Sequence, residues 1–320
     1  MKKPYLEVGL FATLHATVVA TLLLLFLWPA GAAAPNNVPL GLVGQGPQVE
    51  QIAKMLDERQ PGSLEVTLFN DKDQATEAIA QKEIYGAIVM AREPEVLIAT
   101  AASPAVAQLI TQLGNQILIQ SASMQGLQVP QLKTTDLAPL SESDPRGVVF
   151  GSATLPLVIG GISLGAIAML RFKRWGPKLS FVFIASIGTG LLSAGLMTTV
   201  FDALPGEYWM NALAMTAVLA AIGMALVGAE AVAGTAGFGL TAATLFLVGN
   251  PLNGVSLPVE FYPSFWGQVG QLMPVGSGFE LLKRVNYFPE ADMQNQWWVL
   301  AIWILVGLGL SLLRTKVKES

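Results

Sequence analysis

Long stretches of the chain carry no Asp, Glu, Lys or Arg, and short charged segments separate them. A bilayer core about 30 Å thick is crossed by roughly 20 apolar residues of α-helix. Trimmed to their apolar parts, the uncharged stretches therefore predict six membrane-spanning helices. These are Val8–Trp28, Val148–Leu170, Leu179–Phe201, Trp209–Val227, Val232–Val248 and Trp297–Leu313.

The first apolar stretch has two interpretations. Lys2 and Lys3 precede it and three alanines follow at 32–34, which is the order found in a secretory signal peptide. Its apolar part is longer than the apolar region of a typical signal peptide, which has roughly 7–15 residues. We therefore expect a retained helix.

The segment 31–146 holds most of the acidic residues and predicts a small soluble α/β domain inserted after the first helix. Apolar residues at helical spacing, alternating positions and short apolar runs indicate its elements. We expect one layer of helices, and linkers at 31–47 and 129–146. The expected elements are a helix over Val49–Leu56, a strand over Leu64–Phe69, a helix capped by Asn70 or Asp71 that runs to about Glu83, strands over Tyr85–Met90 and Glu95–Thr100, and a helix from Pro104 to about Gln125.

The segment at about 250–290 is too apolar for a solvated loop and too often interrupted by Pro and Gly for a span. Short amphipathic pieces near Ser264–Leu272 and Gly276–Val285 predict a re-entrant or interfacial hairpin on the outer face, because irregular backbone at membrane depth must be shielded from lipid. Its candidate gating or substrate-path residues are Pro251, Pro258, Pro263, Phe265, Trp266 and Pro274.

The basic residues predict an orientation, because Lys and Arg are enriched in cytoplasmic loops. Both termini are expected in the cytoplasm of a bacterial cell, with 31–146 outside the plasma membrane. Lys283 and Arg284 deviate from this pattern, since they fall on the outer side. The supporting residues are Lys2 and Lys3, then Arg171, Lys173, Arg174 and Lys178 between spans two and three, then Arg314, Lys316 and Lys318.

Composition agrees with a membrane protein and excludes several other classes. Only 12% of the 320 residues are charged, 52% are hydrophobic, and the mean hydropathy is +0.54. The net charge of −4 gives no sign of a nucleic-acid partner. Without cysteine and with a single histidine, neither a bound metal nor another cofactor is expected.

That histidine, His15, lies at mid-depth in the first span. An ionisable residue there is a candidate for a proton relay, but a neutral imidazole can also simply bond to a backbone carbonyl. The spans show no Ser/His pair, no paired Asp and no HExxH pattern, so we expect no enzyme.

Small residues interrupt most of the predicted spans. They allow helix backbones to approach closely in lipid, where the hydrophobic effect does not drive association. Tight packing within the chain is one interpretation, and Gly161-xxx-Gly165 is also a candidate dimer contact. Pro156 predicts a kink in the second span.

The order of these features resembles the ABC-2 type permease family, and most closely its phage-infection-protein-like branch. The resemblance extends over essentially the whole chain. Residues that carry it in the outer domain are Ala75-x-x-Ala78-Ile79-x-x-Lys82 and Gly86-Ala87-Ile88-Val89. Those in the membrane half are Gly249-Asn250-Pro251, Leu257-Pro258, Phe265-Trp266, Leu272-Met273-Pro274 and the helix Gly278–Arg284.

The resemblance implies an all-α bundle of six transmembrane helices, like a type V ABC exporter, with the α/β domain inserted after the first helix. It also implies a homodimer driven by a separate cytoplasmic ATPase, and Arg171, Lys173, Arg174 and Lys178 would form the coupling loop. One departure is that this loop is short and lacks the acidic–Gly–Thr pattern usual in the family. The chain has no GxxxxGK[ST] motif of its own.

Two functions follow from these observations. The first is a permease subunit that exports a lipid-like or other amphipathic envelope substrate. The second is a membrane scaffold or receptor that transports nothing and whose outer domain binds an envelope protein or lipid. The short inner loop favours the second function. Its four cations could equally contact only the anionic headgroups of membrane lipids, without touching a partner protein.

Overall fold

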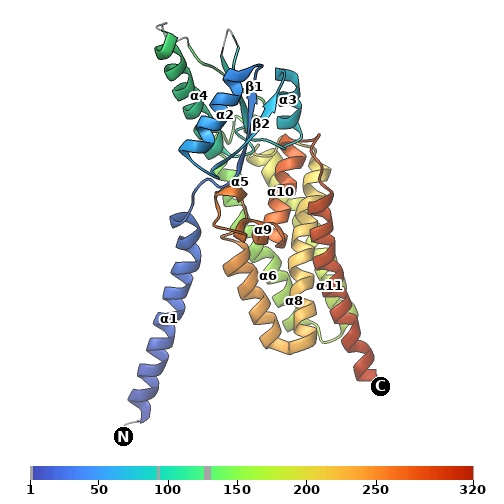
Figure 1. Ribbon diagram of the computed structural model, residues 1–320. Coiled ribbons are helices and arrows are strands. Elements are labelled where there is room, and N and C mark those ends of the chain that lie inside the picture. The colour runs from blue at the N-terminus through green and yellow to red at the C-terminus, as the bar shows by residue number, and fades with distance from the viewer. Residues whose placement is uncertain (1–2, 92–93, 126–130, 320) are drawn as a thin grey trace.

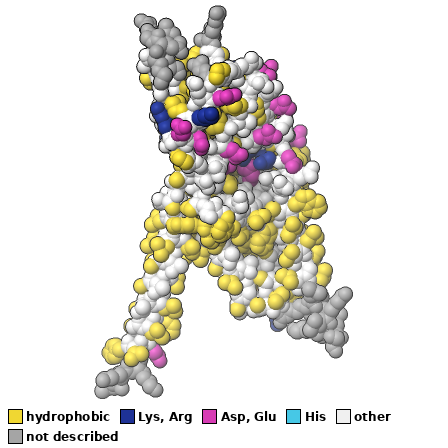
Figure 2. Space-filling view, in the orientation of Figure 1, with side chains coloured by type: hydrophobic (Ala, Val, Ile, Leu, Met, Phe, Trp, Pro, Cys, Tyr) yellow, Lys and Arg dark blue, Asp and Glu magenta, His cyan; other side chains and the backbone are white. Residues whose placement is uncertain are grey.

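The computed structural model describes residues 3–91, 94–125 and 131–319. An α/β domain caps a helical bundle, and the first helix, α1 (Lys3–Gly31), stands apart from that bundle along most of its length (Figure 1). Charged side chains gather on the domain, while apolar side chains cover the sides of the helices (Figure 2).

The domain contains a five-stranded sheet with strand order β2-β1-β3-β4-β5. Neighbouring strands are parallel except for β3 and β4, whose connection is too short for the helical crossover that a parallel pair needs. The strands are β1 (Val38–Val43), β2 (Leu64–Phe69), β3 (Gly86–Val89), β4 (Glu95–Ile98) and β5 (Lys133–Asp136).

Helices cover both faces of this sheet, so the expected single layer of helices is wrong. One apolar cluster joins α2 (Pro47–Arg59) and α4 (Pro104–Gln125) to one face. A second cluster joins α3 (Lys72–Ala80) to the other face, where Phe288 and Ala291 from the membrane half also pack. Crossovers that place helices on both faces bury the central strands completely, and β1 is accordingly almost entirely buried.

Two strands lie in segments that the sequence predicted to be linkers. β1 contains Pro39 and Gly41, which are depleted in strands. Gly41 is required there because an added Cβ would lie 2.9 Å from the Cβ of Ala87 on β3. β5, at the sheet edge, has no apolar residue to mark it. The remaining strands and helices lie where the pattern predicted, and Asp71 caps α3 by accepting a 2.9 Å hydrogen bond from the Gln74 backbone N–H.

Five helices are long and apolar enough to cross a membrane, as expected of a multi-pass membrane protein. The fourth is central, because 78% of its most apolar window is buried against 39% or less in the others. The five are α1, α5 with α6 (Val148–Ser152, Thr154–Arg171), α7 with η1 (Trp175–Gly195, Leu196–Val200), α8 with η2 (Tyr208–Thr244, Leu245–Gly249) and α11 (Gln294–Glu319).

The predicted fourth and fifth spans both fall within α8 and η2. The fourth ends before Gly234 and the fifth begins two residues before it. The φ of 63° and ψ of −146° of Gly234 are not helical. Side chains of Leu226 and Phe238 both lie within 3.3 Å of the position a Cβ would take on Gly165. Twelve residues of straight helix would separate them by about 18 Å, so the chain turns at Gly234 and runs back beside its first arm (Figure 1).

Glycines bring the helices of the bundle together within the chain. A Cβ on Gly161 would lie 2.7 Å from Ile222, and one on Gly165 would lie 2.8 Å from Leu226. The Gly161-xxx-Gly165 pair therefore forms the contact between α6 and α8 and is not available as a dimer contact. Pro156, where the sequence predicts a kink, lies in the first turn of α6, just after the boundary between α5 and α6 at Ala153.

The Pro-interrupted segment forms η3 (Val259–Phe261), α9 (Trp266–Gln271) and α10 (Pro274–Tyr287). These elements lie between the domain and the bundle (Figure 1). α9 and α10 correspond to the two predicted amphipathic pieces. Both helices contribute residues to the candidate site.

Candidate functional site

The helix α10 connects the domain to the central helix. Pro274 occupies its first turn, where a missing N–H costs nothing. One face of α10 is buried in the bundle, and Gly278 lies so close to Val218 of α8 that no side chain would fit. The rest of its surface carries Glu280, Lys283 and Arg284.

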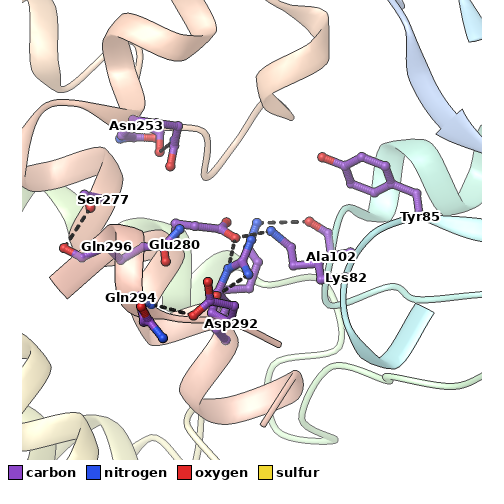
Figure 3. Close-up of polar contacts among 12 residues, drawn as sticks. Lys82, Tyr85, Ala102, Asn253, Ser277, Glu280, Asp292, Gln294 and Gln296 are labelled. Carbon is purple, nitrogen blue, oxygen red and sulfur yellow. Dashed lines mark hydrogen bonds and ion pairs between the residues drawn. The ribbon is translucent and has the colours of Figure 1, made fainter. Parts of the chain in front are cut away.

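Glu280 and Lys283 contact the domain in a buried junction, where Glu280 lies beside Lys82 (Figure 3). The Nζ of Lys82, which follows α3, forms an ion pair with the Glu280 carboxylate, and Arg284 Nε donates to the same Oε1 at 2.8 Å. Lys283 Nζ donates to the Ala102 carbonyl at 2.9 Å. The domain is thus attached to α10 by charge-assisted hydrogen bonds, which are stronger than neutral ones.

The junction is rich in positive charge. Burial raises the pKa of Glu280, but Lys82, Lys283 and Arg284 outweigh that effect and lower it to about 2. Burial lowers the pKa of Lys283 to about 8, and the nearby Lys82 contributes to this lowering. Glu280 therefore stays ionised while three cations surround it.

A cavity of about 510 Å³ opens beside this junction. The domain, η3, α10 and α11 all contribute to its walls. Charged and apolar side chains both line the cavity, as in a site for an amphipathic molecule. Its charged residues are Lys82, Glu83, Glu260, Glu280, Lys283 and Arg284, and the apolar side chains include Ile84, Val259, Leu272, Trp298, Val299 and Ile302.

Two further polar residues shape the cavity. Tyr85 points from the domain into the space before α10 (Figure 3) and donates a 2.6 Å hydrogen bond to Glu260 Oε2. Burial and the adjacent Glu260 raise the Tyr85 pKa well above its usual value, so the phenol stays protonated and donates. Gln296 also lines the cavity, and its buried Oε1 has no hydrogen-bond partner among the described residues.

The six predicted gating residues do not line this cavity. The ring of Phe265 stacks on Trp266 at 5.2 Å, and Trp266 contacts Trp28 edge-on at 5.7 Å. This aromatic group therefore joins the hairpin to the end of α1. Of the prolines, Pro258 and Pro274 are buried, and Pro251 and Pro263 are half-buried.

The predicted coupling loop keeps three of its four cations on the surface. Arg171, Lys173 and Arg174 are exposed. Lys178 is buried, where its Nζ lies 2.5 Å from Glu230 Oε1 and 4.5 Å from the Trp175 ring centroid. Lys178 thus joins α7 to α8 and is not free to contact a partner protein. Lys2 and the side chains after Leu312 lie outside the described part of the chain.

His15 is exposed on α1, away from the cavity. Among the residues that the structure describes, no group of three or more His, Cys, Asp or Glu side chains could hold a metal ion.

The sequence did not predict the cluster of Lys82, Tyr85, Glu260, Glu280 and Lys283. Its members come from separate elements, and no spacing links them. One signal existed, since Lys283 and Arg284 departed from the charge pattern of an outer segment. Two adjacent basic residues in an apolar helix on the outer side of the membrane can indicate a buried ionic contact.

A comparison of the chain with family models, with curated proteins and with solved structures found no match. The site therefore has to be interpreted from its own geometry.

Proposed function

We propose that this protein is the permease subunit of an ABC-2 type exporter, which moves an amphipathic envelope molecule outward. The observation that carries the proposal is the cavity of about 510 Å³ between the domain, η3, α10 and α11, which is lined by both charged and apolar side chains. An amphipathic substrate needs both kinds of side chain, since a polar headgroup left without partners in an apolar site costs several kcal/mol.

The arrangement of helices supports movement linked to this cavity. α10 touches the domain through Lys82 and the central helix through Val218. A shift of α8 would therefore change the shape of the cavity. We propose that the two arms of α8 on either side of Gly234 each cross the membrane, which makes six spans with both termini in the cytoplasm.

The driving force would come from a separate ATPase on the cytoplasmic side. Arg171, Lys173 and Arg174 are exposed at the connection between α6 and α7 and are available for such a contact. The exposed apolar surface of α1 suits lipid or a second copy of the chain in a homodimer.

Export by the purified protein, reconstituted with a candidate ATPase, tests the proposal. ATP-dependent movement of a labelled lipid is expected. Replacing Phe265→Ala together with Trp266→Ala should slow export at least severalfold, because the contact between the hairpin and α1 is lost. Unchanged export by the double variant would argue against a role for this aromatic pair.

A scaffold or receptor is the second candidate, because the burial of Lys178 leaves only three cations for a coupling protein. Co-purification separates the two functions. A bound ATPase that is lost in an Arg171→Ala, Lys173→Ala and Arg174→Ala triple variant supports the exporter. Envelope proteins as the only partners support the scaffold.

A further inference from the structure

We propose that the cavity between the domain, α10 and α11 binds the headgroup of an anionic lipid that enters from the outer half of the membrane. This inference specifies the substrate class of the proposed exporter, and it rests on that function only for the direction of transport. Lipid binding itself requires no ATPase and can be measured alone.

The charge distribution in the cavity favours an anion at α10. Three cations and three carboxylates line the cavity in total, but the carboxylates are unevenly placed. Glu83 is exposed, and Glu260 already accepts a hydrogen bond from Tyr85. Among the described residues of the cavity, Glu280 is the carboxylate that forms ion pairs, with Lys82 and Arg284, and Lys283 also acts on it electrostatically.

Of the three cations, Lys283 is the one that forms no direct ion pair among the described residues, and Glu280 and Glu260 attract it only from farther away. It is 8% exposed, and the hydrogen-bond acceptor found for it is the neutral carbonyl of Ala102. No carboxylate lies within 4 Å of its Nζ in the described part of the chain. An ammonium has three N–H donors, so a phosphate next to Lys283 and Arg284 would supply the missing charge and acceptors.

The apolar residues of the cavity suit acyl chains. Trp298 and Ile302 lie one turn apart on α11, a helix apolar enough to cross the membrane, and both side chains are exposed. Leu272 adds a third exposed apolar side chain to the cavity lining. Tryptophan is enriched where headgroups meet hydrocarbon, which places the opening at the level of the outer headgroups.

Gln296 indicates a further feature of the headgroup. Its buried Oε1 has no partner in the described residues, and an unsatisfied buried acceptor is destabilising. A hydroxyl on the ligand would satisfy it. Phosphatidylglycerol combines a phosphate, hydroxyls and two acyl chains, and it is therefore the probe.

The test measures lipid binding to the full-length protein in detergent by native mass spectrometry. Phosphatidylglycerol is compared with phosphatidylcholine of identical chains and with soluble glycerol phosphate. We expect phosphatidylglycerol to bind at least tenfold more tightly than phosphatidylcholine, a difference of about 1.4 kcal/mol. Equal binding of the two lipids overturns the proposal. Competition by glycerol phosphate at equal concentration would assign the site to a soluble anion and overturn the proposal that it binds a lipid.

Matched variants locate the binding. Lys283→Gln keeps a donor for Ala102 but removes the charge, and it should weaken phosphatidylglycerol binding about tenfold. Arg146→Gln, an exposed cation just before α5 that lies outside this cavity, should leave binding unchanged. If both variants bind like the wild type, the charged residues of the cavity do not bind the lipid.

A second pair avoids the risk that the Lys283 variant misfolds. Trp298 is 63% exposed and lines the cavity, whereas Trp209 is 71% exposed and does not. Trp298→Ala should weaken lipid binding several-fold and Trp209→Ala should not, with melting temperatures unchanged in both. Equal effects of the two variants contradict the proposal. Lipid binding without transport would refute the exporter but not the lipid site.

Discussion

Individual glycines determine which helices of this protein can touch. Gly161 and Gly160 are adjacent on α6, yet their surroundings differ. A Cβ on Gly161 would lie 2.7 Å from Ile222, whereas one on Gly160 would meet Leu219 at an ordinary 3.5 Å. The contact between α6 and α8 therefore tolerates a side chain at position 160 but not at position 161.

This difference predicts the behaviour of two alanine variants. Gly161→Ala should lower the unfolding free energy by about 1–3 kcal/mol, because a well-packed core resists an extra methyl group. Gly160→Ala should be close to neutral. Unfolding titrated with SDS in mixed micelles measures both, and an equal response would show that the α6–α8 packing described here is wrong.

Glu95 is a residue of the domain whose ionisation stabilises the fold. Its Oε2 accepts from Lys72 at 2.6 Å, and its Oε1 accepts from Thr135 at 2.6 Å and from Lys133 at 3.2 Å. Burial raises the pKa of Glu95, but these donors outweigh it and lower the value to about 2. The ionised form is thus favoured in the folded state.

The lowered pKa of Glu95 makes the stability of the fold depend on pH. A folded pKa of about 2 lies below the unfolded value of about 4.3, so the stabilisation is complete above the unfolded value. It is lost as the pH falls toward 2. Glu95→Gln should lower the melting temperature at pH 7 and flatten its decline between about pH 5 and 2. Glu65→Gln, an exposed carboxylate on β2, is the control and should change neither.

At the scale of elements, the turn in α8 depends on one residue. Gly234 has a φ of +63° and ψ of −146°, a region that side chains avoid, yet no atom lies within 4 Å of where its Cβ would be. The requirement for glycine is therefore one of backbone conformation and not of space. The turn separates two arms that would otherwise form one continuous helix.

Gly234→Ala should consequently destabilise the bundle by about 1–3 kcal/mol, the cost of a strained backbone conformation. Gly239→Ala is the matched variant, because its Cβ would also have no neighbour and its backbone is helical. It should be neutral or slightly stabilising, since alanine is the better helix former. Thermal unfolding of both variants by circular dichroism is the measurement, and a stable Gly234→Ala protein would exclude the proposed turn.

At the scale of the whole molecule, the domain and the connection between α6 and α7 lie at opposite ends of the bundle (Figure 1). The proposed orientation places 31–146 outside the cell and Arg171–Lys178 inside. The chain contains no cysteine, so a single introduced thiol reports its own location without a background signal.

A reagent that cannot cross the bilayer should therefore label Asp73→Cys in intact cells and label Lys173→Cys only after permeabilisation. Both side chains are exposed, which removes burial as an explanation for a lack of labelling. The reverse result would invert the orientation and would place the cavity on the cytoplasmic side.

Much of the architecture was predictable because it depends on local patterns. The apolar stretches identified the long helices, and alternation identified β2. β5 was missed because its four residues carry no apolar pattern, and β1 because Pro and Gly are rare in strands. The candidate site was missed for a related reason. The prolines and aromatic residues stand out in the sequence, but the cavity is lined by other residues, which come from separate elements and share no local pattern.

The sequence alone thus determined which segments are apolar helices and where a polar domain interrupts them, because burial in lipid or in a core imposes a period on neighbouring residues. Only the tertiary structure decided that Lys82 meets Glu280, since these residues are 198 positions apart. An ion pair of that kind leaves no periodic trace, because it depends on how two folded elements are placed and not on the residues near either one.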